Sequence, residues 1–313
     1  MRQEIEKYVN RLRVLARSPE TIGNFRRVLR RHVLWLEQRN ILEAKSVRLS
    51  HLERYARQLL QWHAVNCARS RIQLLRRFYG WLEQQKVIGE NPAKGLGVPK
   101  RVEPLPPSPP DAATVYKVIG NIDAKGPVGK RNRAILEVFF STGLRRSEFL
   151  GLELGDVRLK DRTIMVRAGK GNKDRVVLLS GRACRALSLY MEQARPLLAD
   201  GLPGQEAWAE HCRCNGKAPD KLLWLAAHGG PLIKVTLNNY FKQWAADIGQ
   251  RFHPHLLRHA FAVHLLRRGA DIRHVQALLG HESLDTTKIY LRLVKEDYKR
   301  EYDRAFPLIK VRF

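Results

Sequence analysis

The chain has 313 residues, of which 44% are hydrophobic, so it can bury a core. This length exceeds that of a usual single domain, and two domains are expected. Lysine and arginine number 57 against 30 acidic residues, and the net charge of +27 is shared by the segments before and after residue 110. This balance argues against an ordinary small-molecule enzyme and indicates a polyanionic partner, either nucleic acid or an anionic membrane surface.

A membrane is the less favoured of these two partners. The sequence has no run of about 18 uncharged apolar residues and begins without a signal-peptide pattern. Its four cysteines are scattered and do not suggest a disulfide framework, which is typical of a reducing compartment. We therefore expect a cytoplasmic, nucleoid-associated protein that does not bind membranes.

The first hundred residues show only helical patterns. Over Pro19–Gln38 apolar residues recur at helical spacing, with Ser18 placed as the N-cap. A second amphipathic helix is predicted around Arg69–Gln85, and a capping box of Ser50 and Glu53 predicts the start of a helix between the two. Together these patterns predict a small helical bundle.

Both longer helices carry arginines on the face opposite their apolar residues. One such face is equally typical of a solvated surface, but two in so basic a segment favour contact with DNA. The arginines concerned are Arg26, Arg27, Arg30, Arg31, Arg69, Arg71, Arg76 and Arg77. Residues 1–97 are thus predicted to form a helical DNA-binding domain, and residues 98–110, which contain six prolines, an extended connector.

Residues 111–313 are predicted to form the second domain, which is mainly helical with a small β-hairpin. A helix over Arg131–Phe140 is followed by a turn and by a second helix that opens near Arg145. Two β-branched runs, Thr163–Arg167 and Arg175–Leu179, flank a glycine-rich turn and predict the hairpin.

The last third of the chain is marked by helix-ending and helix-capping residues. Pro254 is placed to open one helix and Gly269 to end it. Asp271 is placed to cap the next helix, which Gly280 ends.

Four short motifs occur in order along this second domain. They are Thr142-Gly143-Leu144-Arg145-Arg146-Ser147-Glu148, then Gly169-Lys170-Gly171-Asn172-Lys173-Asp174-Arg175, then His255-Leu256-Leu257-Arg258-His259, and finally Leu279-Gly280-His281 with Tyr290 nine residues later. Any one of them is a weak signal, but the four in this order and spacing are strong. In them the chain resembles the tyrosine recombinases, also called lambda-integrase-like recombinases, and most closely their two-domain Xer and integrase types.

The resemblance covers most of the chain and implies a fold, an activity and a set of site residues. The fold is a helical SAM-like core-binding domain followed by a catalytic domain, together forming a clamp on DNA. The activity is site-specific recombination through a 3′-phosphotyrosyl intermediate and a Holliday junction, as used in integration, excision, transposition or resolution of DNA elements. The implied catalytic residues are Arg145, Lys170, His255, Arg258, His281 and Tyr290.

The chemistry of a phosphodiester points to the same arginines. The phosphate becomes five-coordinate and more negative during attack, so cations must be held around it. Arginine suits this task because its planar fork donates two hydrogen bonds to phosphate oxygens and stays charged. Arg145 and Arg258 are the predicted clamp, and Glu148, one helical turn after Arg145, is expected to orient the cations.

Tyr290 is the candidate nucleophile, with His255 as the acceptor of its proton and His281 as a hydrogen-bond donor to the phosphate. A phenol has an ordinary pKa near 10, and the positive pocket is expected to favour the phenolate. Lys170 is the expected general acid for the departing oxygen, although Lys173 is close enough to compete. Lys173 and Arg175 are further predicted DNA contacts.

No cofactor or metal is expected, because the protein-DNA ester conserves the bond energy and side-chain cations replace a divalent ion. One cluster, His211-Cys212-Arg213-Cys214, suggests a zinc site but lacks the usual second pair of ligands.

The segment after Tyr290 ends in apolar residues that need a partner. In the family such tails dock on a neighbouring subunit, which predicts a homo-tetramer on two synapsed DNA sites. Two other functions are compatible with the motifs: a type IB topoisomerase, which shares the phosphotyrosine chemistry, and a catalytically silent DNA-binding protein.

Overall fold

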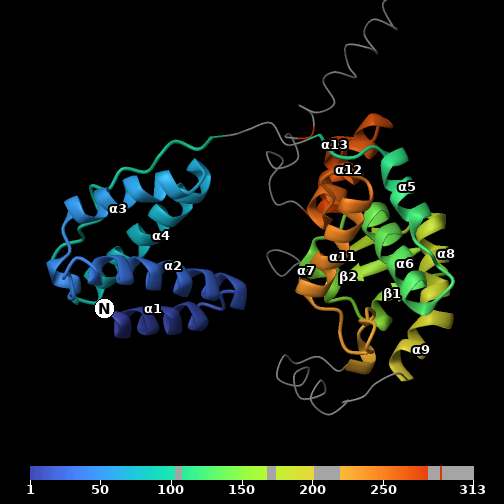
Figure 1. Ribbon diagram of the computed structural model, residues 1–313, viewed down its shortest axis with the longest axis horizontal. Coiled ribbons are helices and arrows are strands. Elements are labelled where there is room, and N and C mark those ends of the chain that lie inside the picture. Colours follow the sequence, from blue (N-terminus) through green and yellow to red (C-terminus); the bar gives the residue numbers. More distant parts are fainter. Residues whose placement is uncertain (103–107, 168–173, 201–218, 281–289, 291–313) are drawn as a thin grey trace, which may run out of the picture. The chain divides into compact units, whose positions relative to one another are not determined.

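The computed structural model describes residues 1–102, 108–167, 174–200, 219–280 and 290. The chain divides into two compact units, Met1–Pro104 and Leu105–Phe313, and the division lies inside the proline-rich stretch (Figure 1). Each unit has a hydrophobic core of its own.

The first unit is built from four helices. Figure 1 shows α1 and α2 side by side, and α3 likewise contacts α4. The elements are α1 Arg2–Val14, α2 Pro19–Glu37, the 3-10 turn η1 Ala44–Ser46, α3 Leu49–Trp62 and α4 Val65–Gln84. Ser18 caps α2 as predicted, since its hydroxyl accepts the backbone N–H of Thr21 at 3.3 Å.

Two helix starts in this unit differ from the prediction. The capping box of Ser50 and Glu53 is wrong, because α3 already begins at Leu49 and both residues lie within it. The imidazole of His51 instead accepts the backbone N–H of Arg48. Helix α4 begins at Val65, four residues before the expected start, because the buried Ala68 extends its apolar face.

The second unit is mainly helical with one small sheet, which confirms the predicted fold class. Its helices are α5 Ala112–Asn121, α6 Pro127–Thr142, α7 Arg146–Leu150, α8 Gly181–Leu189, α9 Arg195–Asp200, α11 Lys234–Asp247, α12 Pro254–Arg267 and α13 Ile272–Leu279. A π-helical turn, η3 Tyr190–Ala194, joins α8 to α9, and 3-10 turns occur at η2 Leu154–Asp156 and η4 Pro219–Lys221. In the described ranges no helix is both long and apolar enough to span a bilayer.

The sheet has three antiparallel strands in the order β1-β2-β3. Strands β2 Thr163–Val166 and β3 Arg175–Leu178 form the predicted hairpin, with Thr163 opposite Leu178 and Val166 opposite Arg175. Strand β1 Val157–Arg158 was not predicted, because two residues are too few to show an alternating pattern. Arg175 thus stands at the turn end of the hairpin, where β3 begins after the glycine-rich segment.

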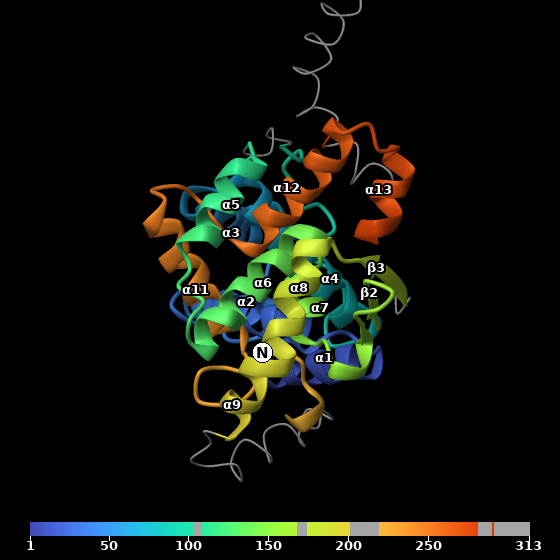
Figure 2. The same cartoon turned by 90° about the vertical axis from the view of Figure 1, so that its right-hand side faces the viewer.

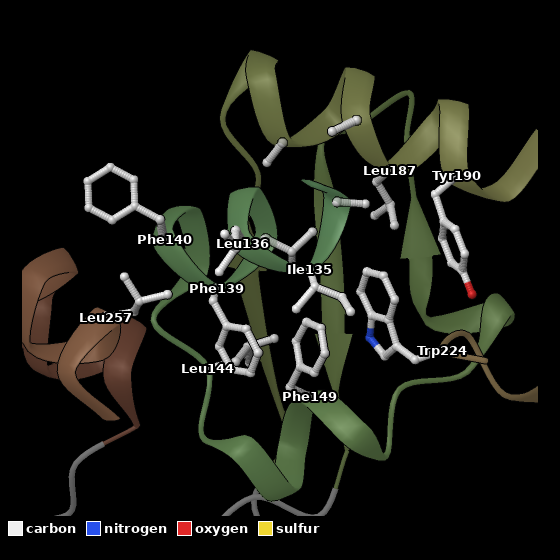
Figure 3. Packing of buried hydrophobic residues seen from close by; sticks show 14 of the residues in the cluster. Ile135, Leu136, Phe139, Phe140, Leu144, Phe149, Leu187, Tyr190, Trp224 and Leu257 are labelled. Carbon is white, nitrogen blue, oxygen red and sulfur yellow. The ribbon is translucent and has the colours of Figure 1, made fainter. Parts of the chain in front are cut away.

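Helix α6 lies in the middle of the second unit and contacts α5, α8, α12 and β3 (Figure 2). Aromatic rings fill the space beside it, as Figure 3 shows. Phe149 stacks on Phe139 with ring centroids 3.9 Å apart and on Trp224 at 4.5 Å, and Tyr190 stacks on Trp224 in turn. Because Phe149 belongs to α7, this packing fixes the short helix that follows Arg145.

The two helices that carry the last motifs begin and end as predicted. Pro254 is the first residue of α12, and the side chain of His253 accepts the backbone N–H of Leu256. Asp271 caps α13 by accepting the backbone N–H of Arg273 at 2.7 Å. Gly280 ends α13 with φ +63°, a left-handed conformation that favours glycine.

Candidate active site

Three consecutive carbonyl oxygens at the end of α13 accept hydrogen bonds from three arginine side chains. The pairs are Arg175 Nε to Leu278 O at 3.2 Å, Arg258 Nη2 to Leu279 O at 2.6 Å, and Arg145 Nη2 to Gly280 O at 2.7 Å. The last carbonyls of a helix have no partner within the helix and form the negative end of its dipole. The end of α13 therefore gathers three cations that come from β3, α12 and the start of α7.

Glu148 joins two of these arginines. Its carboxylate accepts hydrogen bonds from Arg175 Nη1 and Nη2 at 2.9 and 2.7 Å, from Arg145 Nη1 at 2.7 Å and from the Arg145 backbone N–H at 2.8 Å. Burial by itself would raise the pKa of Glu148, but the hydrogen bonds from Arg175 and from the Arg145 amide outweigh it and lower that pKa to about 2. Glu148 is therefore ionised at neutral pH and holds the two guanidinium groups beside each other.

Arg258 is the most buried of the three arginines, with 2% of the residue exposed. Its Nη1 donates to Gly143 O at 2.6 Å, so the side chain joins the end of α6 to the end of α13. Burial, and after it the charge of Arg145, lower the pKa of Arg258 to about 10, so the guanidinium stays protonated at neutral pH. A guanidinium has five N–H donors, and these two hydrogen bonds leave capacity for the oxygens of a phosphate.

Tyr290 is packed in a small apolar cluster formed by α12 and α13, and 2% of it is exposed. Burial raises the pKa of its hydroxyl, while the charges of Arg258 and Arg145 act in the opposite direction. The two arginines thus favour the phenolate, as expected, but burial outweighs them and the net pKa of the hydroxyl is raised. Removal of the hydroxyl from water raises its pKa by more than the two arginine charges lower it.

Two histidines of α12 form a row that ends at this tyrosine. The ring of His259 packs edge-on against the ring of Tyr290, with centroids 5.2 Å apart, and His255 packs edge-on against His259 at 4.6 Å. Burial, and after it His255, lower the pKa of His259 to about 4. Burial and Arg258 likewise lower the pKa of His255. Both rings are therefore neutral at pH 7 and offer a nitrogen that can accept a proton.

The contact of His259 with Tyr290 was not predicted from the sequence. His259 follows His255 by four residues, so the two rings lie one helical turn apart. Its Nδ1 is buried and has no hydrogen-bond partner in the part of the chain that the structure describes. The helical spacing was a usable signal, but only the fold brings Tyr290 to this face.

The predicted DNA-contacting arginines of the first unit differ in their surroundings. Arg26 and Arg30 of α2 both donate to the carboxylate of Glu6 on α1 at 2.9 Å. The partly buried arginines of α4 contact their own unit, Arg69 through Pro99 O and Arg71 through His63. The exposed ones are Arg27, Arg30, Arg31, Arg76 and Arg77.

Three predicted site residues, Lys170, Lys173 and His281, lie outside the described residues, as do Cys212 and Cys214 of the suspected zinc cluster. Within the described ranges no group of three or more His, Cys, Asp or Glu side chains is arranged to hold a metal ion.

Comparison with known proteins assigns the family. Residues 112–297 match the phage integrase family, and residues 5–86 match the N-terminal SAM-like domain of phage integrases. The chain belongs to this family, so the resemblance seen in the motifs is confirmed and the protein is a tyrosine recombinase.

Curated relatives match along nearly the whole chain. The tyrosine recombinase XerC 2 of Ralstonia nicotianae is 34% identical over 312 residues, which are 97% of this chain and 85% of the relative. The tyrosine recombinase XerC of Chromobacterium violaceum is 33% identical over 318 residues, covering 100% of this chain and 97% of the relative.

Solved structures share the fold at lower identity. A XerH site-specific recombinase bound to palindromic difH substrate after cleavage has a TM-score of 0.70 and 21% identity, covering 97% of this chain and 84% of that one. A lambda integrase dimer bound to a COC′ core site has a TM-score of 0.68 and 14% identity, covering 93% and 94%.

Proposed function

We propose that this recombinase cleaves DNA with Tyr290 and rejoins the strand to one from a second site. One observation carries the proposal. Arg145 and Arg258 are bound to adjacent carbonyls of α13, and both act electrostatically on the tyrosine hydroxyl. A phosphodiester attracted to these two charges comes within reach of the nucleophile.

In the cleavage step Tyr290 Oη bonds to phosphorus while the bond from phosphorus to the 5′ oxygen breaks. The products are a 3′-phosphotyrosyl protein and a free 5′-hydroxyl. Arg145 and Arg258 donate hydrogen bonds to the non-bridging oxygens as their negative charge grows. Religation reverses the step with a hydroxyl from the partner strand, so neither ATP nor a divalent cation is required.

Two proton transfers accompany this exchange of bonds. His255, assigned by its sequence motif, accepts the phenolic proton; burial lowers the pKa of its ring, which is therefore neutral at pH 7, as an acceptor must be. Lys170 gives a proton to the departing 5′ oxygen, with Lys173 as the alternative donor, and His281 donates a hydrogen bond to the phosphate. The roles of these last three residues rest on the sequence motifs.

The substrate of this site is duplex DNA with specific recombination sites. The XerH and lambda integrase relatives are bound to DNA, which supports this choice, and the charge of +27 agrees with it. Residues 1–97 bind the core of the site through their exposed arginines, residues 98–110 connect the units, and residues 111–313 cleave. Four protomers exchange their C-terminal tails on two synapsed sites, in the cytoplasm at the nucleoid.

The test is a covalent capture. The full chain is incubated with a pool of randomised duplexes, each nicked near the centre of one strand, so that the short 5′-hydroxyl fragment diffuses away and the adduct accumulates. We expect a protein-DNA adduct without magnesium, with the nucleotide remnant on Tyr290 in peptide mapping. Tyr290→Phe should keep salt-sensitive DNA binding and form no adduct, because only the attacking oxygen is removed. A remnant on another residue, or a requirement for magnesium, would contradict the proposal.

Strand exchange is tested next with two copies of the captured duplex. Recombinant products are expected, with four-way junctions as intermediates. Adduct formation with relaxation of supercoils but without exchange between sites would favour topoisomerase activity instead.

A further inference from the structure

Arg175 differs from Arg145 and Arg258 in how many of its nitrogens donate hydrogen bonds within the described part of the chain: all three do, against the two Nη atoms of each of the other arginines. Nε donates to Leu278 O, and Nη1 and Nη2 both donate to Glu148, so three of its five N–H groups have acceptors within the chain. The side chain is 12% exposed. With all three nitrogens already donating inside the protein, Arg175 has less hydrogen-bonding capacity left for a phosphate than Arg145 or Arg258.

The close fit around Gly280 shows how tightly this guanidinium is enclosed. A Cβ added at Gly280 would lie 3.0 Å from Arg175 Nε and Nη1 and 3.1 Å from its Cδ. Glycine at this position therefore serves two purposes: it adopts the left-handed φ, and it lets the arginine pack against the backbone. The end of α13 and the start of β3 are in this way fitted to each other.

The contacts of Arg175 lead to Arg145 in two ways. The carboxylate of Glu148 accepts hydrogen bonds from both guanidinium groups, and the carbonyls of Leu278 and Gly280 that bind the two arginines belong to one helix end. Without Arg175, Glu148 would be a buried carboxylate with Arg145 as its one cationic partner. Its attraction would then move the Arg145 guanidinium away from the carbonyl of Gly280. Arg175 thus contacts both groups that hold the Arg145 guanidinium, the carboxylate of Glu148 and the end of α13.

We propose that Arg175 is a positioning residue of the cleavage reaction, holding Glu148 and the end of α13 so that Arg145 and Arg258 meet the phosphate in register. This inference rests on the proposed function. It replaces the expectation that Arg175 contacts DNA. Because Arg175 begins β3, it also ties the strand that follows the Lys170 motif to the same helix end.

The test separates binding from cleavage. Arg175→Lys keeps the positive charge but loses the planar fork that serves two carboxylate oxygens at once. At saturating concentrations of the captured duplex, the rate of adduct formation should fall 10- to 100-fold, as is common when a supporting hydrogen bond is removed. The dissociation constant for the same duplex and its dependence on salt should stay unchanged. Arg158→Lys, an exposed arginine on β1 at the other edge of the sheet, is the matched control and should cleave at the wild-type rate.

A double-mutant cycle adds a measurement that general destabilisation would not produce. Glu148→Gln should also slow cleavage, and the double variant should be no slower than the slower single variant, because both changes break one unit. Urea unfolding shows whether each variant is folded under the assay conditions. If Arg175→Lys does not fold, Arg175→Gln is put through the same cycle.

The outcomes are distinct. Arg175→Gln, which removes the charge, is used for the salt series: a slope reduced by about one, with an unchanged rate at saturation, would make Arg175 a phosphate contact and overturn the inference. Rate losses that multiply in the double variant would overturn it too, since the two residues would then act independently. Failure of the proposed function looks different, because wild type and the Arg158→Lys control would then also form no adduct on Tyr290, and the inference would fall with it.

Discussion

At the scale of single residues, the backbone conformation of Gly143 fixes the carbonyl oxygen that binds Arg258. Gly143 has φ +60°, and its carbonyl oxygen accepts the hydrogen bond from Arg258 Nη1. A Cβ at this position would lie 2.5 Å from Phe261 Cδ1 and 3.1 Å from Leu279 Cδ2. The residue must therefore be glycine for reasons of both backbone conformation and space.

We predict that Gly143→Ala lowers the free energy of unfolding by about 2–4 kcal/mol, from left-handed strain and overpacking against Phe261. Urea unfolding of the full chain measures this change. The control is Gly120→Ala near the end of α5, where a Cβ meets nothing within 4 Å and alanine is the better helix former. A Gly143→Ala protein as stable as the control would show that the α6 turn and Phe261 adapt without cost.

The histidines show how burial sets chemistry at this scale. His255 and His259 both have a lowered pKa because the ring loses water and faces Arg258 or a second imidazole. A lowered pKa means that the neutral form persists to a lower pH. The ability of His255 to accept a proton is thus retained in mildly acidic solution.

At the scale of elements, α13 is a short helix whose two ends do different work. Asp271 caps its beginning, and its last carbonyls receive Arg175, Arg258 and Arg145. A helix of eight residues is marginal by itself, so its end is held in place by these capping interactions and by the packing of Val275 and Leu279. Loss of the cap at the start of α13 should therefore displace the carbonyls at its end that bind the arginines.

We predict that Asp271→Ala costs about 1 kcal/mol of stability, as the loss of an N-cap usually does, and also slows adduct formation several-fold at saturating DNA. Asp111→Ala provides the matched control, because Asp111 caps α5 by accepting the backbone N–H of Thr114 at 2.8 Å and takes no part in the site. It should lose similar stability and cleave at the wild-type rate. Equal rates for the two variants would mean that the α13 platform is maintained by its C-terminal contacts alone.

At the scale of the whole molecule, basic residues are spread over both units, and some of them are neutralised locally by ion pairs with acidic side chains. Glu6 of α1 pairs with Arg26 and Arg30, whereas Arg76 is exposed on α4. A phosphate contact releases a counterion only where the cation is not already neutralised by the protein. The eight arginines predicted from sequence should therefore contribute unequally to DNA binding.

We predict that Arg76→Gln reduces the slope of log affinity against log salt concentration by about one, because one phosphate contact is lost. Arg26→Gln should change this slope less, since Glu6 already balances that charge. Fluorescence anisotropy of a labelled duplex over a salt series measures both. Equal slopes for the two variants would show that the pair with Glu6 breaks on DNA.

Much of the fold follows from local sequence. Ser18, Asp271 and Gly280 mark helix ends because a side-chain acceptor or a left-handed backbone is needed there, and the hairpin of β2 and β3 follows from β-branched runs around a glycine-rich turn. The capping box at Ser50 failed because the N-cap lies two positions earlier, at Arg48, whose backbone N–H is accepted by His51.

The residue types of the site were also legible in the sequence. Motif order and spacing identified the family, and the chemistry of phosphate singled out Arg145 and Arg258, since only fixed cations stabilise its growing charge. What the sequence could not determine is which acceptors within the protein each arginine finds. These acceptors come from other elements: Glu148 on α7 and the carbonyls at the end of α13 bind Arg175, and packing between α12 and α13 outweighs the arginines in setting the pKa of Tyr290. Hydrogen bonding and burial of this kind arise between segments far apart in the chain, so the tertiary structure alone decides them.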